Sequence, residues 1–112
     1  MLVLIMSIAV GVLLFALGVP LAMRRVGPNA WYGFRVGRAL EDEKAWYAAN
    51  AACGRWLAIA GAALALSALL NALLGADLAV AALVNGVVLT LGIIVAAAAG
   101  FAAMNADEFP LP

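Results

Sequence analysis

The sequence contains no histidine, a single cysteine and few charged residues, which make up 11% of the chain. The one cysteine, Cys53, cannot form an intrachain disulfide. Without histidine there is no Ser/His or Cys/His pair, and no group of side chains has metal-ligand spacing. No carboxylate lies inside an apolar segment, as a proton or ion carrier would normally require. We therefore predict a protein that is not an enzyme and that needs no metal or cofactor.

Apolar residues, in contrast, make up 69% of the chain. Soluble domains contain about 45–50%, and a fold this small leaves too much of its surface exposed to hide the excess from water. Three apolar runs, at 2–23, 56–74 and 78–104, reach the ~20 residues that span a bilayer. We therefore predict an all-α integral membrane protein with three transmembrane helices in one domain, residues 1–112.

The basic residues all lie between the first and the second apolar run: Arg24, Arg25, Arg35, Arg38, Lys44 and Arg55. Short loops rich in Lys and Arg remain on the cytoplasmic side of a membrane. The sequence therefore predicts an N-terminus outside the cell, with the charged loop and the C-terminal tail in the cytoplasm. Arginines at a membrane surface also meet lipid phosphates, and Arg24, Arg25 and Arg38 are the candidates for head-group contacts.

The second helix is expected to begin before its membrane span, near Glu41 or Asp42. Carboxylates are favoured in the first turn by the helix dipole, and no helix-breaking residue follows until Gly54. A helix from about residue 42 to residue 74 would be ~50 Å long, well beyond the ~30 Å hydrocarbon core. We therefore expect its first three turns to stand in the cytoplasmic interface.

Small and polar residues predict how the spans pack. The three residues at 75–77 allow only a tight turn, so the second and third helices should be antiparallel neighbours. Asn71 and Asn85 would then lie at comparable depth and could form an interhelical amide pair. Gly11 and Gly18 share one face of the first helix, where they permit close approach of another helix. Packing inside the bundle is favoured there over a dimer interface.

Both tyrosines and two of the three tryptophans lie in one stretch, residues 26–54, which begins with a Gly-Pro-Asn turn. Trp46, Asn50 and Gly54 recur at intervals of four and form one stripe on the second helix. Arg35 is close enough in sequence to fold back over this stripe. Together these residues could hold an anionic or carbonyl group, or one another. The alternative is an interfacial belt of aromatic side chains, with arginines on lipid phosphates.

This stretch resembles the signature of the SdpI family of bacterial membrane proteins, which is named for an immunity protein against a secreted killing peptide. The matching positions are a Pro-Asn turn, a Gly-x-Arg segment and the helical stripe: Pro28, Asn29, Gly33, Arg35, Trp46, Asn50 and Gly54. Val36 and Ala39 stand where the family usually has threonines. The resemblance implies a three-span protein of the bacterial inner membrane, with the seven matching residues as the candidate site for a ligand or partner.

Three functions remain open at this stage. The resemblance implies protection against a membrane-active peptide, or sensing of it and capture of a cytoplasmic regulator at the loop. The second function is that of a small structural or accessory subunit of a larger membrane complex, docked through the third span. The third is binding of lipid head groups through the arginines. We favour the first, and nucleic acid is not an expected partner.

Overall fold

The chain forms long helices joined by one structured loop. The structure, a computed structural model, describes residues 1–29 and 31–106. Within these residues it contains α1 (Leu2–Ala22), the 3₁₀ helix η1 (Gly37–Leu40), α2 (Glu43–Leu73) and α3 (Leu78–Ala106). All three α-helices are long and apolar enough to cross a membrane, which confirms the predicted all-α membrane fold. The predicted cytoplasmic tail at 107–112 lies outside the described residues.

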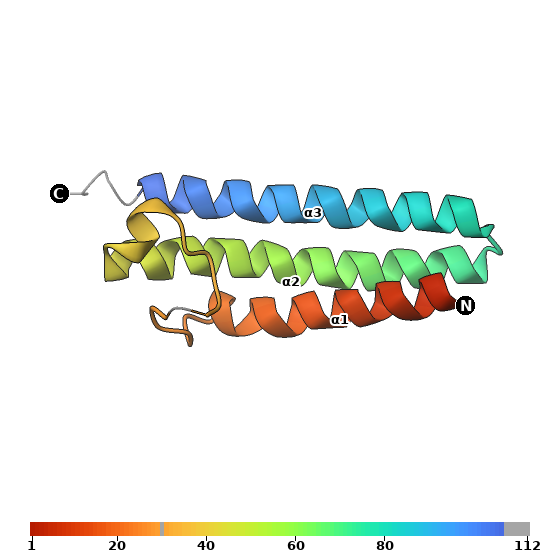
Figure 1. The fold of residues 1–112 in the computed structure, drawn as a ribbon, viewed down its shortest axis with the longest axis horizontal. Coiled ribbons are helices and arrows are strands. Elements are labelled where there is room, and N and C mark those ends of the chain that lie inside the picture. Colours follow the sequence, from red (N-terminus) through yellow and green to blue (C-terminus); the bar gives the residue numbers. More distant parts are fainter. Residues whose placement is uncertain (30, 107–112) are drawn as a thin grey trace.

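The helix α2 lies between α1 and α3, and each of them packs against it rather than against the other (Figure 1). The N-terminus and the α2–α3 turn share one end of the bundle, while the loop from α1 to α2 lies at the other. With 31 residues, α2 is about 46 Å long. It therefore exceeds the ~30 Å hydrocarbon core by several turns.

Glycines bring α1 and α2 into direct backbone contact. Gly11 lies against Gly61, and Gly18 lies against Gly54, so the two helices run antiparallel. A Cβ atom on Gly18 would lie only 2.5 Å from the carbonyl oxygen of Gly54, and one on Gly54 only 2.5 Å from the Cβ of Leu21. No larger residue fits at either position without moving a helix. The prediction that Gly11 and Gly18 pack inside the bundle is confirmed.

The ends of α2 are set by local hydrogen bonds. Asp42 is the N-cap in an extended conformation, and its Oδ1 accepts a bond of 3.0 Å from the backbone N–H of Lys44. At the other end, Gly75 takes the left-handed conformation (φ 69°) that glycine adopts without strain. Asp77 then caps α3 by accepting a 2.8 Å bond from the N–H of Val80. The predicted helix start and the tight turn are both present.

Asn85 joins all three helices near the turn end of the bundle. Its Oδ1 accepts bonds from Asn71 Nδ2 (3.0 Å) and Ser67 Oγ (2.8 Å) on α2, and its Nδ2 donates to Ser7 Oγ (3.1 Å) on α1. The predicted amide pair is confirmed. The two serines were not predicted, because a single serine in an apolar helix forms no sequence pattern. Such a polar junction fixes which faces of the helices meet.

Candidate functional site

Asn50 binds the loop to α2 through the main chain of Phe34. Its Oδ1 accepts a hydrogen bond from the Phe34 N–H, and its Nδ2 donates to the Phe34 carbonyl at 3.1 Å and to the Trp46 carbonyl at 2.9 Å. The Asn50 side chain is only 1% exposed. It thus satisfies both polar groups of a buried loop residue, which would otherwise cost free energy to remove from water.

Trp46 holds the loop at a second point. Its side chain is fully buried, and its Nε1 donates a hydrogen bond of 2.9 Å to the carbonyl of Val26. Gly33 crosses above its ring with φ 117°, a conformation that L-residues rarely adopt. A Cβ atom there would lie 2.7 Å from Asn50 Oδ1 and 3.2 Å from the Trp46 ring. Only glycine therefore fits between the loop and the two side chains.

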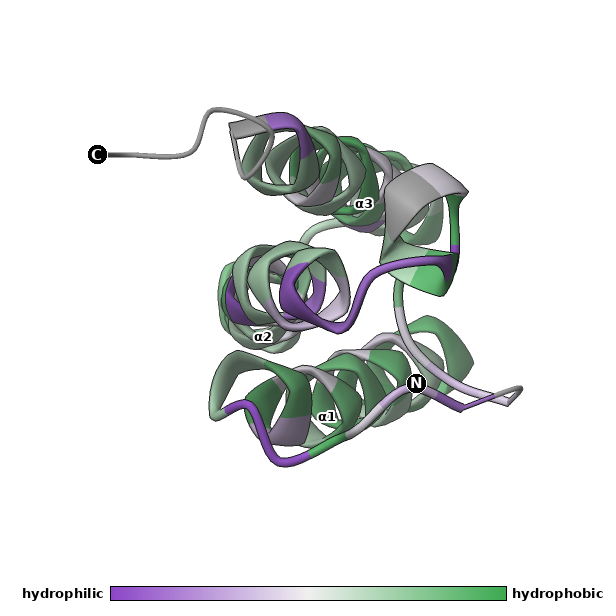
Figure 2. Ribbon diagram, turned by 90° about the vertical axis from the view of Figure 1, so that its left-hand side faces the viewer, coloured by the Kyte–Doolittle hydropathy of each residue, from purple (hydrophilic) through white to green (hydrophobic). Residues whose placement is uncertain are grey.

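Phe34 extends this attachment to α3. Its ring packs edge-on against Phe101, with centroids 5.0 Å apart and an interplanar angle of 84°. Gly100 makes the room, since a Cβ there would lie 2.8 Å from the ring. The loop crosses α2 to reach α3 at this end of the bundle (Figure 2). A buried apolar cluster forms beneath it: Phe34, Ala39, Ala45, Trp46, Ala49, Cys53, Ala96 and Met104.

The first part of the loop is held by Asn29 and Tyr32. Asn29 Oδ1 accepts bonds from the N–H groups of Trp31 and Tyr32, both at 2.8 Å, while its Nδ2 donates to the Gly27 carbonyl. The Tyr32 hydroxyl donates to the Leu17 carbonyl on α1. Burial raises the pKa of Tyr32 above its ordinary value. The loop is therefore attached to α1 as well.

The structure separates the seven residues that the sequence brought together. Gly33, Trp46 and Asn50 meet at one point, where the exposed Gly33 covers the buried Trp46 and Asn50. Gly54 instead packs on α1, where Gly18 and Leu21 fill its notch. Asn29 shapes the turn, and Pro28 is exposed beside it. We refer to Gly33, Trp46 and Asn50, together with the Phe34 main chain they hold, as the clasp. Whether any of the seven residues contacts a partner stays a prediction.

Arg35 is not part of the clasp. It is exposed, and among the described residues its side chain makes no hydrogen bond or ring contact, including with the stripe over which it was expected to fold. Trp31 is 90% exposed, and Val36 and Leu40 are exposed as well. We refer to these four exposed residues as the outer face of the loop. Trp31 and Leu40 were not predicted as candidate site residues, because nothing in the sequence shows which side chains of the loop are exposed.

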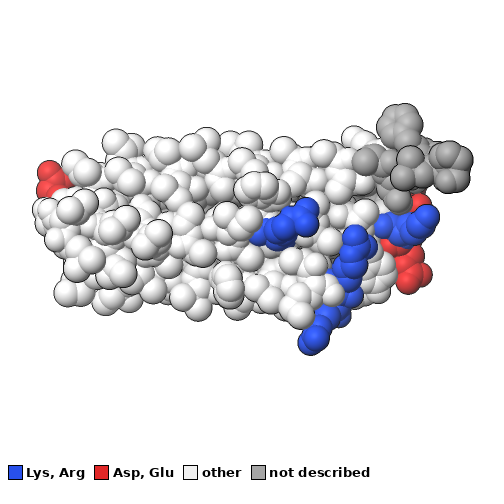
Figure 3. Space-filling view, turned by 180° about the vertical axis from the view of Figure 1, so that it is seen from behind, with Lys and Arg blue, Asp and Glu red and all other residues white. Residues whose placement is uncertain are grey.

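The predicted head-group arginines lie at the loop end of the bundle. Arg24 and Arg25 are exposed directly after α1, and Arg24 has a left-handed backbone, with φ 60°. Arg38 belongs to η1, and its side chain is not described. Figure 3 shows basic side chains gathered toward one end of a largely uncharged face. Within the described residues, no group of three His, Cys, Asp or Glu side chains could hold a metal ion.

Three membrane-length helices and a loop fixed by buried tryptophan and asparagine side chains define a small multi-pass membrane protein. The model of the SdpI/YfhL protein family matches residues 25–104, from the start of the loop almost to the end of α3. The chain therefore belongs to this family, as the signature indicated. Comparison with curated proteins and with solved structures gives no match.

Proposed function

We propose that this protein is a non-enzymatic immunity or signalling protein of the SdpI type, which recognises a peptide or protein partner at the outer face of its loop. Membership of the family supports this role. The observation that carries it is the clasp. The buried Trp46 and Asn50 side chains form their hydrogen bonds with the loop backbone, whereas Arg35 and Trp31 remain exposed. The clasp residues would then act by positioning the loop.

The outer face has the chemistry of a recognition surface. Trp31 offers a large apolar face and an indole N–H, and Arg35 offers a planar set of donors that suits a carboxylate or a backbone carbonyl. Val36 and Leu40 add exposed apolar area on the same loop. Because the loop is already ordered by the clasp and by Asn29, binding would cost little conformational entropy. An amphipathic peptide with acidic or carbonyl groups matches this surface.

We also propose that the loop faces the cytoplasm and that the N-terminus faces outward. The support is the confinement of all the basic residues to the segment between α1 and the middle of α2. In this orientation the α2–α3 turn would lie outside, on the same side as the N-terminus (Figure 1). A partner at the outer face would then be a cytoplasmic regulator or a peptide that has crossed or entered the membrane.

A survival assay tests the proposed function. Bacteria that express the protein would be challenged with a membrane-active killing peptide of the type for which the family is named. Arg35→Ala and Trp31→Ala should lose protection at unchanged protein abundance, whereas Arg25→Ala, which is exposed but outside the outer face, should protect like the parent. Full protection by both loop variants would refute recognition at this face.

A second function, that of an accessory subunit of a larger membrane complex, rests on α3. A shallow hollow of about 350 Å³ lies along its exposed side at Ala82, Gly86 and Thr90, and a Cβ atom on Gly86 would meet nothing within 4 Å. Small residues of this kind let another helix approach closely. Native mass spectrometry of protein extracted gently from its own membrane distinguishes the two: a stoichiometric assembly supports the subunit, and a bare monomer or homo-oligomer supports recognition at the loop.

A further inference from the structure

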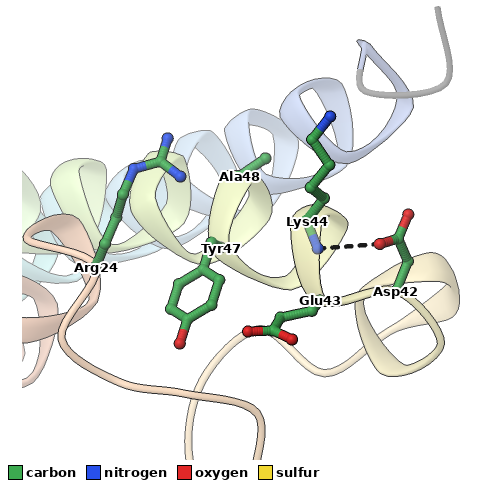
Figure 4. A pocket seen from close by; sticks show the side chains of 6 residues that line it. All are labelled: Arg24, Asp42, Glu43, Lys44, Tyr47 and Ala48. Carbon is green, nitrogen blue, oxygen red and sulfur yellow. Dashed lines mark hydrogen bonds between the residues drawn. The ribbon is translucent and has the colours of Figure 1, made fainter. Parts of the chain in front are cut away.

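A separate pocket opens where α1 ends and α2 begins. It is an open hollow of about 570 Å³, lined by Arg24, Asp42, Glu43, Lys44, Tyr47 and Ala48. In Figure 4, Arg24 and Lys44 extend toward the same side with Ala48 between them, while Tyr47 and Glu43 point to the other side. Arg24 follows the end of α1, Asp42 is the N-cap of α2, and the other four belong to the first turns of α2. We refer to these six residues as the α1–α2 pocket; none of them belongs to the clasp or to the outer face.

The charges of the pocket are both positive and negative. The guanidinium of Arg24 and the ammonium of Lys44 flank a small residue, an arrangement that suits the oxygens of a phosphate group. Across the pocket, the Glu43 carboxylate and the Tyr47 ring suit a primary ammonium, through charge and cation–π attraction. Asp42 is already engaged as the helix cap. A ligand that carries a phosphate and an amine a few bonds apart would match both sides at once.

The position of the pocket matches the level of lipid head groups. Because Gly54 lies against Gly18 in the packed part of the bundle, Arg55 next to it stands about 10 Å deeper along α2 than Ala48. Arg55 is exposed and on roughly the same helical face as Lys44 and Ala48. An arginine at such depth extends toward the interface rather than into the hydrocarbon. The pocket thus lies just above the point where the acyl chains would begin.

We propose that the α1–α2 pocket binds the head group of a phosphatidylethanolamine molecule, with the phosphate between Arg24 and Lys44 and the ammonium at Glu43. Binding of an anionic lipid through Arg24 and Lys44 alone would leave Glu43 beside a second negative charge, which disfavours such a lipid. The pocket therefore selects an amine-bearing head group over a glycerol head group. A bound lipid would bridge α1 and α2 at the point where the loop departs.

Native mass spectrometry of the full chain tests the proposal. Delipidated protein in detergent would be titrated with phosphatidylethanolamine or phosphatidylglycerol of identical acyl chains. We expect one retained molecule of phosphatidylethanolamine, bound about tenfold more tightly than phosphatidylglycerol. Arg24→Asn should weaken binding about tenfold, as loss of one charge-assisted contact implies. Asparagine is chosen because it tolerates the left-handed backbone at this position.

Two further variants make the test specific. Arg25→Asn removes the same charge one residue away, outside the pocket, and should leave binding unchanged. Glu43→Gln should weaken binding of phosphatidylethanolamine and remove the preference over phosphatidylglycerol. Equal losses for the two arginine variants, or a preference that survives Glu43→Gln, would overturn the proposal. Displacement of the lipid by millimolar glycerophosphoethanolamine, which has no acyl chains, would overturn the assignment to a lipid in favour of a soluble phosphoester.

Discussion

Asn50 on α2 holds Phe34 of the loop by both of its main-chain polar groups, accepting from the N–H and donating to the carbonyl. The two residues are sixteen positions apart. The Asn50 side-chain amide pairs with the Phe34 main chain in the way that a neighbouring strand would in a β-sheet. It is buried, so water does not compete for it. This one relationship fixes the course of the loop, and with it the residues that the loop exposes.

Removing the Asn50 amide should therefore destabilise the protein strongly. Asn50→Ala leaves the Phe34 N–H and carbonyl buried without partners, at about 1–3 kcal/mol for each group. We expect a loss of roughly 2–5 kcal/mol in the free energy of unfolding, measured by titration with a denaturing detergent. Asn105→Ala is the matched control, since Asn105 is exposed on α3, and it should change stability by less than about 0.5 kcal/mol. Equal effects of the two variants would contradict the clasp.

Tryptophan substitutions separate the clasp from the outer face. Trp46→Phe keeps most of the buried ring but loses the Nε1 donor to the Val26 carbonyl, which should cost about 1–3 kcal/mol. Trp31→Phe changes a side chain that is almost fully exposed and should leave stability unchanged within about 0.5 kcal/mol. The same unfolding titration measures both. A larger loss for Trp31→Phe would show that the loop is held elsewhere.

Glycine substitutions test the contact between α1 and α2. Gly18→Ala places a methyl group against the Gly54 carbonyl, and the forced separation of the helices should cost about 1–3 kcal/mol. Gly86→Ala, where a Cβ meets nothing, should be neutral or stabilise α3 by up to about 1 kcal/mol, because alanine is the better helix former. If both substitutions were neutral, the close approach of α1 and α2 would be wrong.

The orientation is tested by labelling one exposed residue of the outer face. Leu40→Cys should react with a membrane-impermeant thiol reagent in inverted membrane vesicles but not in intact cells, because the loop is proposed to be cytoplasmic. Cys53 is buried, and Cys53→Ala removes any background from it. A cysteine at the α2–α3 turn, Ala76→Cys, should show the opposite pattern. Labelling of residue 40 in intact cells would reverse the topology.

The helices could be predicted because each follows from features that lie close together in the sequence. Apolar runs gave the three spans, acidic residues gave the start of α2, and the short turn placed Asn71 opposite Asn85. The packing of Gly18 against another helix could also be predicted, since small residues at helical spacing indicate close helix packing. In these elements the local sequence determines the structure almost alone.

The loop could not be predicted in the same way, because long-range contacts determine it. The sequence did not single out Phe34, yet its ring packs on Phe101 of α3, in space that Gly100 provides sixty-six positions later. Trp46 and Asn50 were recognised as a stripe, but their burial depends on Gly33 crossing above them. Arg35 matched the family signature without any indication that its side chain would be exposed. Residue spacing on one helix does not reveal what covers it.

The clasp is tested most directly by hydrogen exchange of the Phe34 amide, measured by NMR on the protein in lipid nanodiscs. We predict that this amide is protected in the parent protein about as strongly as the helix amides. The reason is that the Phe34 N–H is buried and donates its hydrogen bond to Asn50 Oδ1. In Asn50→Ala the protection should be lost at Phe34 while it persists in the middle of α1, α2 and α3. Rapid exchange of Phe34 in the parent protein, or protection that survives Asn50→Ala, would contradict the account.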